Sequence, residues 1–298
     1  MTYLDLCRSG GFEERIESLK RLLEPCRVCP RECGARRLSG ERGQCGAGLE
    51  LEISGYGPHF GEEGPLVGRG GSGTIFFAFC SLNCVFCQNY ETSRGFDRHR
   101  ISVERLARIM MELQEEGCEN INLVSPTHYV PQIVEALHEA CVGGLRLPLV
   151  YNSSGYERLE TIGLLDGIVD IYLPDVKYAD EEVARKYSGI HDYPRVAKEA
   201  LKEMHRQVGD LVLDDRGVAV RGLIIRHLVL PGGLAGTEAL MAFVAREVSP
   251  SSWINIMGQY YPAYIAHRYP EINRRVTADE MKRALAAARA ASPAFHLV

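Results

Sequence analysis

Three cysteines with the spacing C-x3-C-x2-C are the residues that point most directly to chemistry. Cys80, Cys84 and Cys87 follow the apolar segment 74–79, which has the composition of a buried strand. Three thiolates can hold a 4Fe–4S cluster and leave one iron without a protein ligand, whereas full coordination takes four. An open metal position is typical of a reactive site. We therefore interpret these cysteines as ligands of a reactive cluster; the alternative is a structural zinc site with His99 as fourth ligand.

A second group of cysteines, with the spacing C-x2-C-x3-C-x11-C, lies near the amino terminus. Its members are Cys26, Cys29, Cys33 and Cys45. Nearby prolines and glycines provide the turns that let four thiols converge. Four thiolates bind zinc, a single iron or a second 4Fe–4S cluster, and the spacing leaves these alternatives open. Metal binding can fold a lobe that has little hydrophobic core, so we expect a metal site here.

The composition narrows the function classes. The net charge of −5 gives no general attraction to nucleic acid or to an anionic membrane, so we expect neither as a partner. The amino terminus lacks the pattern of a signal peptide, and no apolar stretch approaches the length of a membrane span. Ten cysteines, mostly in metal-like spacings, favour a reducing environment, and we expect a cytoplasmic protein.

Strand and helix patterns alternate after residue 73. Apolar strand patterns at 74–79, 120–124, 147–151, 168–173, 222–230 and 253–257 are each followed by a loop or a helical pattern. Such alternation predicts an α/β fold with a parallel sheet, but it does not distinguish an open barrel from a doubly wound sheet. We expect two domains, a Cys-rich metal-binding lobe at 1–72 and the α/β unit at 73–298.

The three-cysteine motif, with the aromatic Phe86 before its last cysteine, resembles the signature of radical S-adenosylmethionine (SAM) enzymes. The resemblance covers roughly 26–262 and is closest to the pyruvate formate-lyase activating enzyme-like branch. It implies a partial (β/α)6 TIM-like barrel with SAM inside its carboxyl mouth. It also implies that the open iron binds SAM, and that one electron splits SAM into methionine and a 5′-deoxyadenosyl radical.

The resemblance also places SAM contacts at the ends of successive strands. Many family members carry Gly-Gly-Glu after the second strand, where it binds the amino group of SAM. This chain has Ser125-Pro126-Thr127-His128 instead, so we expect Ser125 and Thr127 to take over that contact. His128 is a candidate for proton transfer or simply a loop residue. Arg226 lies within an apolar strand. Burial of its charge is costly unless the guanidinium faces an anion, and we expect that anion to be the SAM carboxylate. The expected contacts are Phe86, Ser125, Thr127, Asn152, Ser153, Asp175, Lys177 and Arg226.

Asp175 and Lys177 form an Asp-x-Lys pair that is similar to one in glycyl-radical-enzyme activases, where the aspartate helps to bind a cation and the lysine faces the cofactor. A simple ion pair is the alternative. The resemblance thus favours hydrogen abstraction from a substrate, which in activases is a glycine of a partner protein. Oxidation, rearrangement or methylation of another substrate, or a non-catalytic electron-transfer role, are the alternatives. All of these functions imply a reductant such as ferredoxin or flavodoxin.

Overall fold

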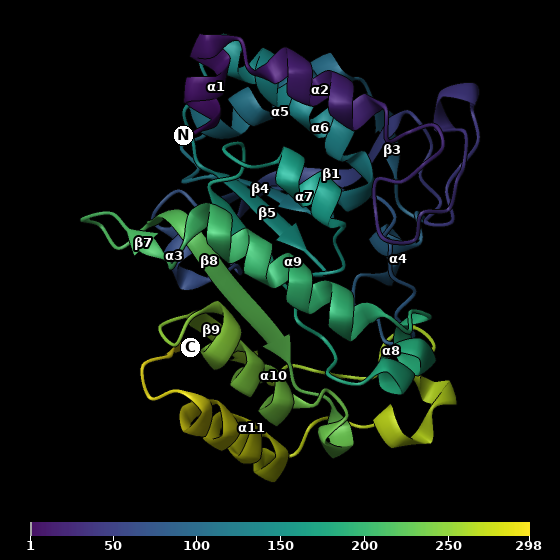
Figure 1. Cartoon of the computed structure of the whole chain (residues 1–298), viewed down its shortest axis with the longest axis vertical. Coiled ribbons are helices and arrows are strands. Elements are labelled where there is room, and N and C mark those ends of the chain that lie inside the picture. Colours follow the sequence, from purple (N-terminus) through teal and green to yellow (C-terminus); the bar gives the residue numbers. More distant parts are fainter. Residues whose placement is uncertain (1) are drawn as a thin grey trace.

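Six parallel strands form the centre of the sheet in the computed structural model, which describes residues 2–298 (Figure 1). They are β2 (Ser72–Phe77), β4 (Ile121–Val124), β5 (Leu149–Ser153), β6 (Ile171–Pro174), β8 (Ala219–Leu228) and β9 (Trp253–Met257). These strands lie side by side in chain order, which is the order of a barrel and differs from that of a doubly wound sheet. Within residues 2–298 the two edge strands do not pair, so the barrel is partial, as predicted.

The helices that follow the strands confirm the predicted alternation. They are α5 (Val103–Glu115), α6 (Val130–Val142), α7 (Leu159–Leu164), α8 (Glu181–Ser188), α9 (Tyr193–Val208), α10 (Thr237–Phe243) and α11 (Ala278–Ala291). Side-chain hydrogen bonds cap the first turn of two of these helices. The Ser102 hydroxyl accepts the N–H of Arg105 at the start of α5, and Thr277 forms a capping box with Glu280 at the start of α11.

Several strands are shifted by two or three residues from the predicted ranges. The strand predicted at 74–79 ends at Phe77, because Phe79 adopts a left-handed conformation with φ of 73° that interrupts extended backbone. The strand predicted at 147–151 extends to Ser153. Asn152 and Ser153 are therefore held by sheet hydrogen bonds rather than by a flexible loop.

The amino-terminal segment contributes to the same sheet. Strand β1 (Leu51–His59) pairs antiparallel with β2 and with the short β3 (His99–Ile101). Helices α1 (Tyr3–Ser9) and α2 (Phe12–Lys20) pack against α6, as seen at the top of Figure 1. The boundary near residue 72 thus falls between two hydrogen-bonded strands, and the division into a lobe and a barrel stays a prediction.

The short elements complete the chain. They are α3 (Gly64–Val67), α4 (Tyr90–Ser93), β7 (Val212–Leu213) and β10 (His296–Leu297). Leu66 of α3 is fully buried in a cluster with Val150, Leu173 and Ile224. Of the helices between residues 2 and 298, none has both the length and the apolar composition that a bilayer crossing requires.

The two faces of β4 differ in polarity. Along β4, Ile121 and Leu123 are buried in the main hydrophobic core, while Asn122 between them projects to the opposite face. There the Asn122 amide donates hydrogen bonds to Glu62 and Ser72. The same face also carries apolar residues, since Val150, which pairs with Asn122, lies in the cluster around Leu66.

Asp170 is a buried carboxyl group just before β6 that should make stability depend on pH. Its Oδ2 accepts the Leu149 N–H at 2.9 Å, and burial raises its pKa from 3.8 to about 6. Between these two values the folded protein retains a proton that the unfolded chain releases. The free energy of unfolding therefore decreases as pH rises through this window.

We expect Asp170→Asn to remove this dependence, because the amide keeps an acceptor for Leu149 and does not ionise. Relative to the variant, the wild-type protein should lose about 2 to 3 kcal/mol of unfolding free energy between about pH 4 and pH 7. Urea denaturation of both proteins at the two pH values measures the difference. An equal stability difference at both pH values would show that folding does not raise the pKa of Asp170.

Candidate active site

The carboxyl ends of the six parallel strands surround one cavity of about 290 Å³. The strands contribute Phe76, Val124, Asn152, Ser153, Arg226, Leu228 and Met257, and Asp175 follows β6 directly. Cys80, Cys84 and Cys87 line the same cavity. Barrel enzymes carry their chemistry at this end of the strands. The cavity is therefore the candidate active site.

The cysteine loop is anchored on the carboxyl end of α8. The N–H groups of Asn83 and Val85 donate to the carbonyl oxygens of Ser188 and Tyr187, at 3.2 and 2.8 Å. These carbonyls belong to the last turn of a helix, which leaves them without helical partners. The same contacts that complete the end of α8 thus fix the conformation of the loop.

Each of the three sulfurs has a polar neighbour. The Leu82 N–H donates to Cys80 Sγ at 3.4 Å, the Ser188 hydroxyl lies 3.0 Å from Cys84 Sγ, and the Ser93 hydroxyl lies 3.2 Å from Cys87 Sγ. Burial raises the pKa of Cys80 to about 12 and also raises that of Cys84, where the charge of Lys177 acts in the opposite direction. The loop therefore offers sulfur ligands in a dry environment.

The aromatic residue of the cysteine motif contacts two tyrosines of the barrel wall. Phe86 is buried, lines the cavity and packs edge-on against Tyr178 and Tyr260, with ring centroids 6.5 and 5.6 Å apart. This packing holds the last part of the loop against the barrel wall.

A network of charged side chains lines the same cavity as the cysteines. The Arg226 guanidinium donates to Asp175 at 2.8 Å, to Glu62 at 3.0 Å and to the Asn152 side chain at 2.7 Å. Lys177 Nζ donates to the other oxygen of Asp175 at 2.7 Å. Burial opposes ionisation of Asp175, but the two cations bring its pKa down to about 2. The carboxylate therefore stays charged and fixes both cations.

Arg226 is paired, as its cost in an apolar strand requires, but its partners differ from the expectation. Its guanidinium is bound by Asp175 and Glu62 of the chain itself, rather than left free for the SAM carboxylate. Glu62 also accepts from the amides of Asn122 and Asn152, at 3.0 and 3.1 Å. Sequence reasoning missed Glu62; a buried arginine signals that some carboxylate must approach, but not which one.

The segment after β4 is only partly where we expected it. Ser125, with φ of 56°, lines the cavity. Thr127 does not line the cavity. The left-handed Ser125 is followed by a short helical turn at Thr127–Tyr129, in which the Thr127 hydroxyl donates to Glu157 at 2.7 Å. His128 is buried against Ala78 O at 2.8 Å, and burial lowers its pKa to about 3, so neither residue faces the cavity.

Ser153 and Ser154 are two hydroxyl-bearing residues of the cavity wall. The Ser153 hydroxyl accepts the Gly155 N–H at 3.2 Å. The Ser154 hydroxyl oxygen is itself buried and has no hydrogen-bond partner within residues 2–298. A buried hydroxyl without a partner is unfavourable, so this part of the wall is left with an unsatisfied polar group.

The four amino-terminal cysteines lie close together. A Cβ atom added to Gly43 would lie 3.4 Å from the sulfurs of both Cys33 and Cys45. Cys33 lies near enough to Cys26, and Cys45 to Cys29, for the charge of one thiol to act on the pKa of the other. The fold therefore brings together the thiols of a group that is spread over twenty residues of sequence.

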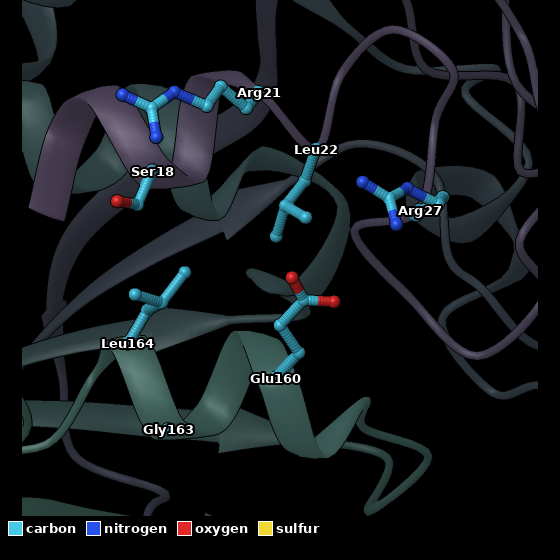
Figure 2. A pocket seen from close by; sticks show the side chains of 7 residues that line it. All are labelled: Ser18, Arg21, Leu22, Arg27, Glu160, Gly163 and Leu164. Atoms are coloured by element: carbon cyan, nitrogen blue, oxygen red, sulfur yellow. The ribbon is translucent and has the colours of Figure 1, made fainter.

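A second cavity, of about 360 Å³, lies between α2 and α7 (Figure 2). Figure 2 shows Arg21, Arg27 and Glu160 around it, with Leu22 and Leu164. Of the described residues that line it, none is among those predicted for the active site. Glu160 is already paired with Arg158 at 2.8 Å. The cavity beside the cysteine loop thus remains the candidate.

Comparison with known proteins identifies the family. The model of the radical SAM superfamily matches residues 74–232, more than half of the chain. An uncharacterised protein of Methanocaldococcus jannaschii is 33% identical over 295 residues, which cover 95% of this chain and 79% of that protein. This chain belongs to the radical SAM superfamily. Membership implies an enzyme that uses SAM and a 4Fe–4S cluster; it does not specify the activase-like branch.

Two solved structures are similar to this chain at low sequence identity. A radical SAM methyltransferase from Sphaerobacter thermophilus is 16% identical with a TM-score of 0.50, covering 76% of this chain and 65% of its own. SuiB from Streptococcus suis, bound to S-adenosylmethionine, is 11% identical with a TM-score of 0.49; the match covers 74% of this chain and 48% of SuiB. This chain therefore spans about half to two thirds of these proteins, and the likeness concerns the fold alone.

The residues present fit the cluster and SAM by their chemistry. Within residues 2–298, no group of three or more His, Cys, Asp or Glu side chains is arranged so that it could hold a metal ion. In a 4Fe–4S cluster, however, each thiolate binds a different iron, so the ligands line a pocket. Three cysteines on one wall, the Lys177 cation and the partnerless Ser154 hydroxyl match a cluster with a polar, charged ligand.

We expect removal of the Arg226 charge to be strongly destabilising. Arg226→Met leaves Glu62 without its cation and Asp175 with Lys177 alone, and should lower the free energy of unfolding by about 3 to 5 kcal/mol. Arg195, which is 59% exposed and paired with Asp192 and Glu199, is the matched control; its substitution should cost less than about 1 kcal/mol. Equal losses in chemical denaturation would contradict a central role for the buried network.

Proposed function

We propose that this protein reductively cleaves SAM in the barrel cavity and uses the resulting radical to abstract hydrogen from a substrate. The observation that carries the proposal is the cavity itself, where Cys80, Cys84 and Cys87 lie beside a fixed set of charged and hydroxyl groups. When bound, a 4Fe–4S cluster supplies one electron and an open coordination position. The remaining requirements, namely binding, orientation and exclusion of water, belong to this chain's residues.

The proposed ligand contacts follow from the charge of Lys177 and from which polar side chains line the cavity. Lys177 carries a positive charge on the cavity wall near the cysteines, and its ion pair with Asp175 holds it in one position. An anionic ligand group is therefore best placed near Lys177. We propose Ser125, Ser153 and Asn152 as hydrogen-bonding residues and Phe86 as an apolar contact, all of which line the cavity. Burial of the sulfurs keeps water from the reacting atoms.

We further propose an activase-like substrate, a backbone glycine of a partner protein. The supporting observation is the Asp175–Lys177 pair, which is formed at 2.7 Å and lines the cavity, as the resemblance to activases implies. A small molecule or another protein side chain is the alternative substrate. The proposed electron source is a one-electron carrier of the ferredoxin or flavodoxin class.

We also propose that Cys26, Cys29, Cys33 and Cys45 hold a metal group. The support is the approach of Cys33 and Cys45 to one another beside Gly43, together with the burial of Cys26 and Cys29. A metal here would crosslink the turns of residues 26–45, which contain only one short 3-10 helix at Arg37–Ser39.

We expect the anaerobically reconstituted, dithionite-reduced protein to release 5′-deoxyadenosine and methionine from SAM, as measured by liquid chromatography and mass spectrometry. Cys84→Ser should reduce this release to background, because the cluster loses one of three ligands. The matched control is Cys118→Ser, a buried cysteine outside both cysteine groups, which should retain release.

Two results would contradict the proposed function. One is the absence of deoxyadenosine from protein that contains its full cluster complement. The other is release that persists unchanged in Cys84→Ser, since the radical would then not depend on the three-cysteine loop. Deoxyadenosine formation without added substrate would still support SAM cleavage, and glycine-containing peptides could then be tested for deuterium exchange.

A further inference from the structure

Backbone hydrogen bonds shape the turns that carry the four amino-terminal cysteines. The Cys26 N–H donates to the Ala35 carbonyl oxygen and the Gly34 N–H donates to the Cys26 carbonyl oxygen, at 2.9 and 3.1 Å. The Gly43 N–H donates to the Ala47 carbonyl oxygen at 2.9 Å, which closes the turn that contains Cys45. In the active-site loop, the Leu82 N–H donates to Cys80 Sγ at 3.4 Å. The thiols are thus held by hydrogen-bonded turns, and a metal group bound to the sulfurs would join these turns.

A buried cation lies beside the four thiols. Arg37 is only 1% exposed, and its guanidinium donates to the carbonyl oxygens of Gly48 and His128. The same guanidinium lies over the Tyr129 ring, with its central carbon 5.7 Å from the ring centroid. A buried cation fixed in this way would offset the negative charge that the thiols carry when they bind a metal.

The four-cysteine group lies directly against the active-site loop. A Cβ atom at Gly46 would lie 2.6 Å from the Phe79 ring, so only glycine allows this contact. Cys45 precedes Gly46, and Cys80 follows Phe79, so the contact joins a ligand of one group to a ligand of the other. The Arg42 guanidinium lies over the same ring, with its central carbon 5.5 Å from the ring centroid.

A second connection joins the two groups. The side chain of Arg31, which lies between Cys29 and Cys33, donates through Nε to the carbonyl oxygen of Ser81, between Cys80 and Cys84. A metal that only crosslinked the amino-terminal turns could lie anywhere in the lobe. Contact through two sites with the loop that carries the reactive cysteines is instead what short-range electron transfer requires.

We propose that Cys26, Cys29, Cys33 and Cys45 hold a second 4Fe–4S cluster, which passes single electrons across the Phe79–Gly46 contact to the cluster at the three-cysteine loop. The second half of this route, the reduction of the active-site cluster, rests on the proposed function. A reduced one-electron carrier of the ferredoxin or flavodoxin class loses one electron, and the second cluster gains it. The second cluster is then reoxidised as the active-site cluster is reduced. No bond or proton is exchanged.

The first test counts iron and acid-labile sulfide in the full-length protein after anaerobic reconstitution. We expect about eight iron atoms per chain, and about four in the triple variant Cys80→Ser/Cys84→Ser/Cys87→Ser. The pair Cys29→Ser/Cys33→Ser should also retain about four, and Cys118→Ser about eight. Electron paramagnetic resonance of the triple variant should show a 4Fe–4S signal that SAM does not change.

These counts separate the inference from the proposed function. One zinc and about four iron atoms in the wild-type protein, or no iron in the triple variant, would overturn the second cluster. About eight iron atoms without SAM cleavage would leave the second cluster intact and remove the radical function. Because the pair variant can fail to fold, the wild-type metal count decides the site by itself.

The second test addresses the electron route. Reduced flavodoxin should reduce the active-site cluster in the wild-type protein much faster than in Cys29→Ser/Cys33→Ser, as followed by rapid-freeze paramagnetic resonance. Dithionite, a small reductant, should reduce that cluster in both proteins and thereby shows that the site remains intact. Equal rates with flavodoxin would overturn the relay and leave the second cluster with a structural role.

Discussion

The buried charge of Arg226 is the constraint on which the rest of the site depends. An unpaired guanidinium inside a barrel would be strongly destabilising, and this one is bound by Asp175, Glu62 and Asn152. These partners come from the end of β6, from the segment before α3 and from β5. One ionic requirement thus joins neighbouring strands of the barrel to the amino-terminal part of the chain, and fixes the part of the cavity wall that carries these residues.

Phe79 provides the corresponding constraint on the cysteine loop. Its left-handed backbone ends β2 and directs the chain into the cysteine loop. Its ring lies between Gly46 and Gly95, at both of which a Cβ atom would clash with it. The guanidinium groups of Arg42 and Arg98 lie over the ring at 5.5 and 5.6 Å. The position of the loop therefore depends on residues from the cysteine-rich segment as well as on the barrel.

The order of strands and helices was predictable because it depends on local periodicity, which each segment carries in its own sequence. The ends of the strands and helices were less predictable. Asn152 lies just beyond the predicted strand 147–151 but is held within β5 by pairing with β4 and β6. Thr127 was assigned to the cavity, and a left-handed Ser125 turned it toward Glu157. Both differences come from contacts and backbone conformations that no local pattern reports.

By itself, the sequence determined the class of chemistry, since the spacing of Cys80, Cys84 and Cys87 after an apolar strand limits what those thiols can bind. It also determined the repeated strand–helix architecture. Only the tertiary structure decided which carboxylates pair with Arg226, that Glu62 reaches the barrel interior, and that the four amino-terminal cysteines lie against the active-site loop. Ligand spacing is a property of a short segment, whereas the partner of a buried charge is set by segments that meet only on folding.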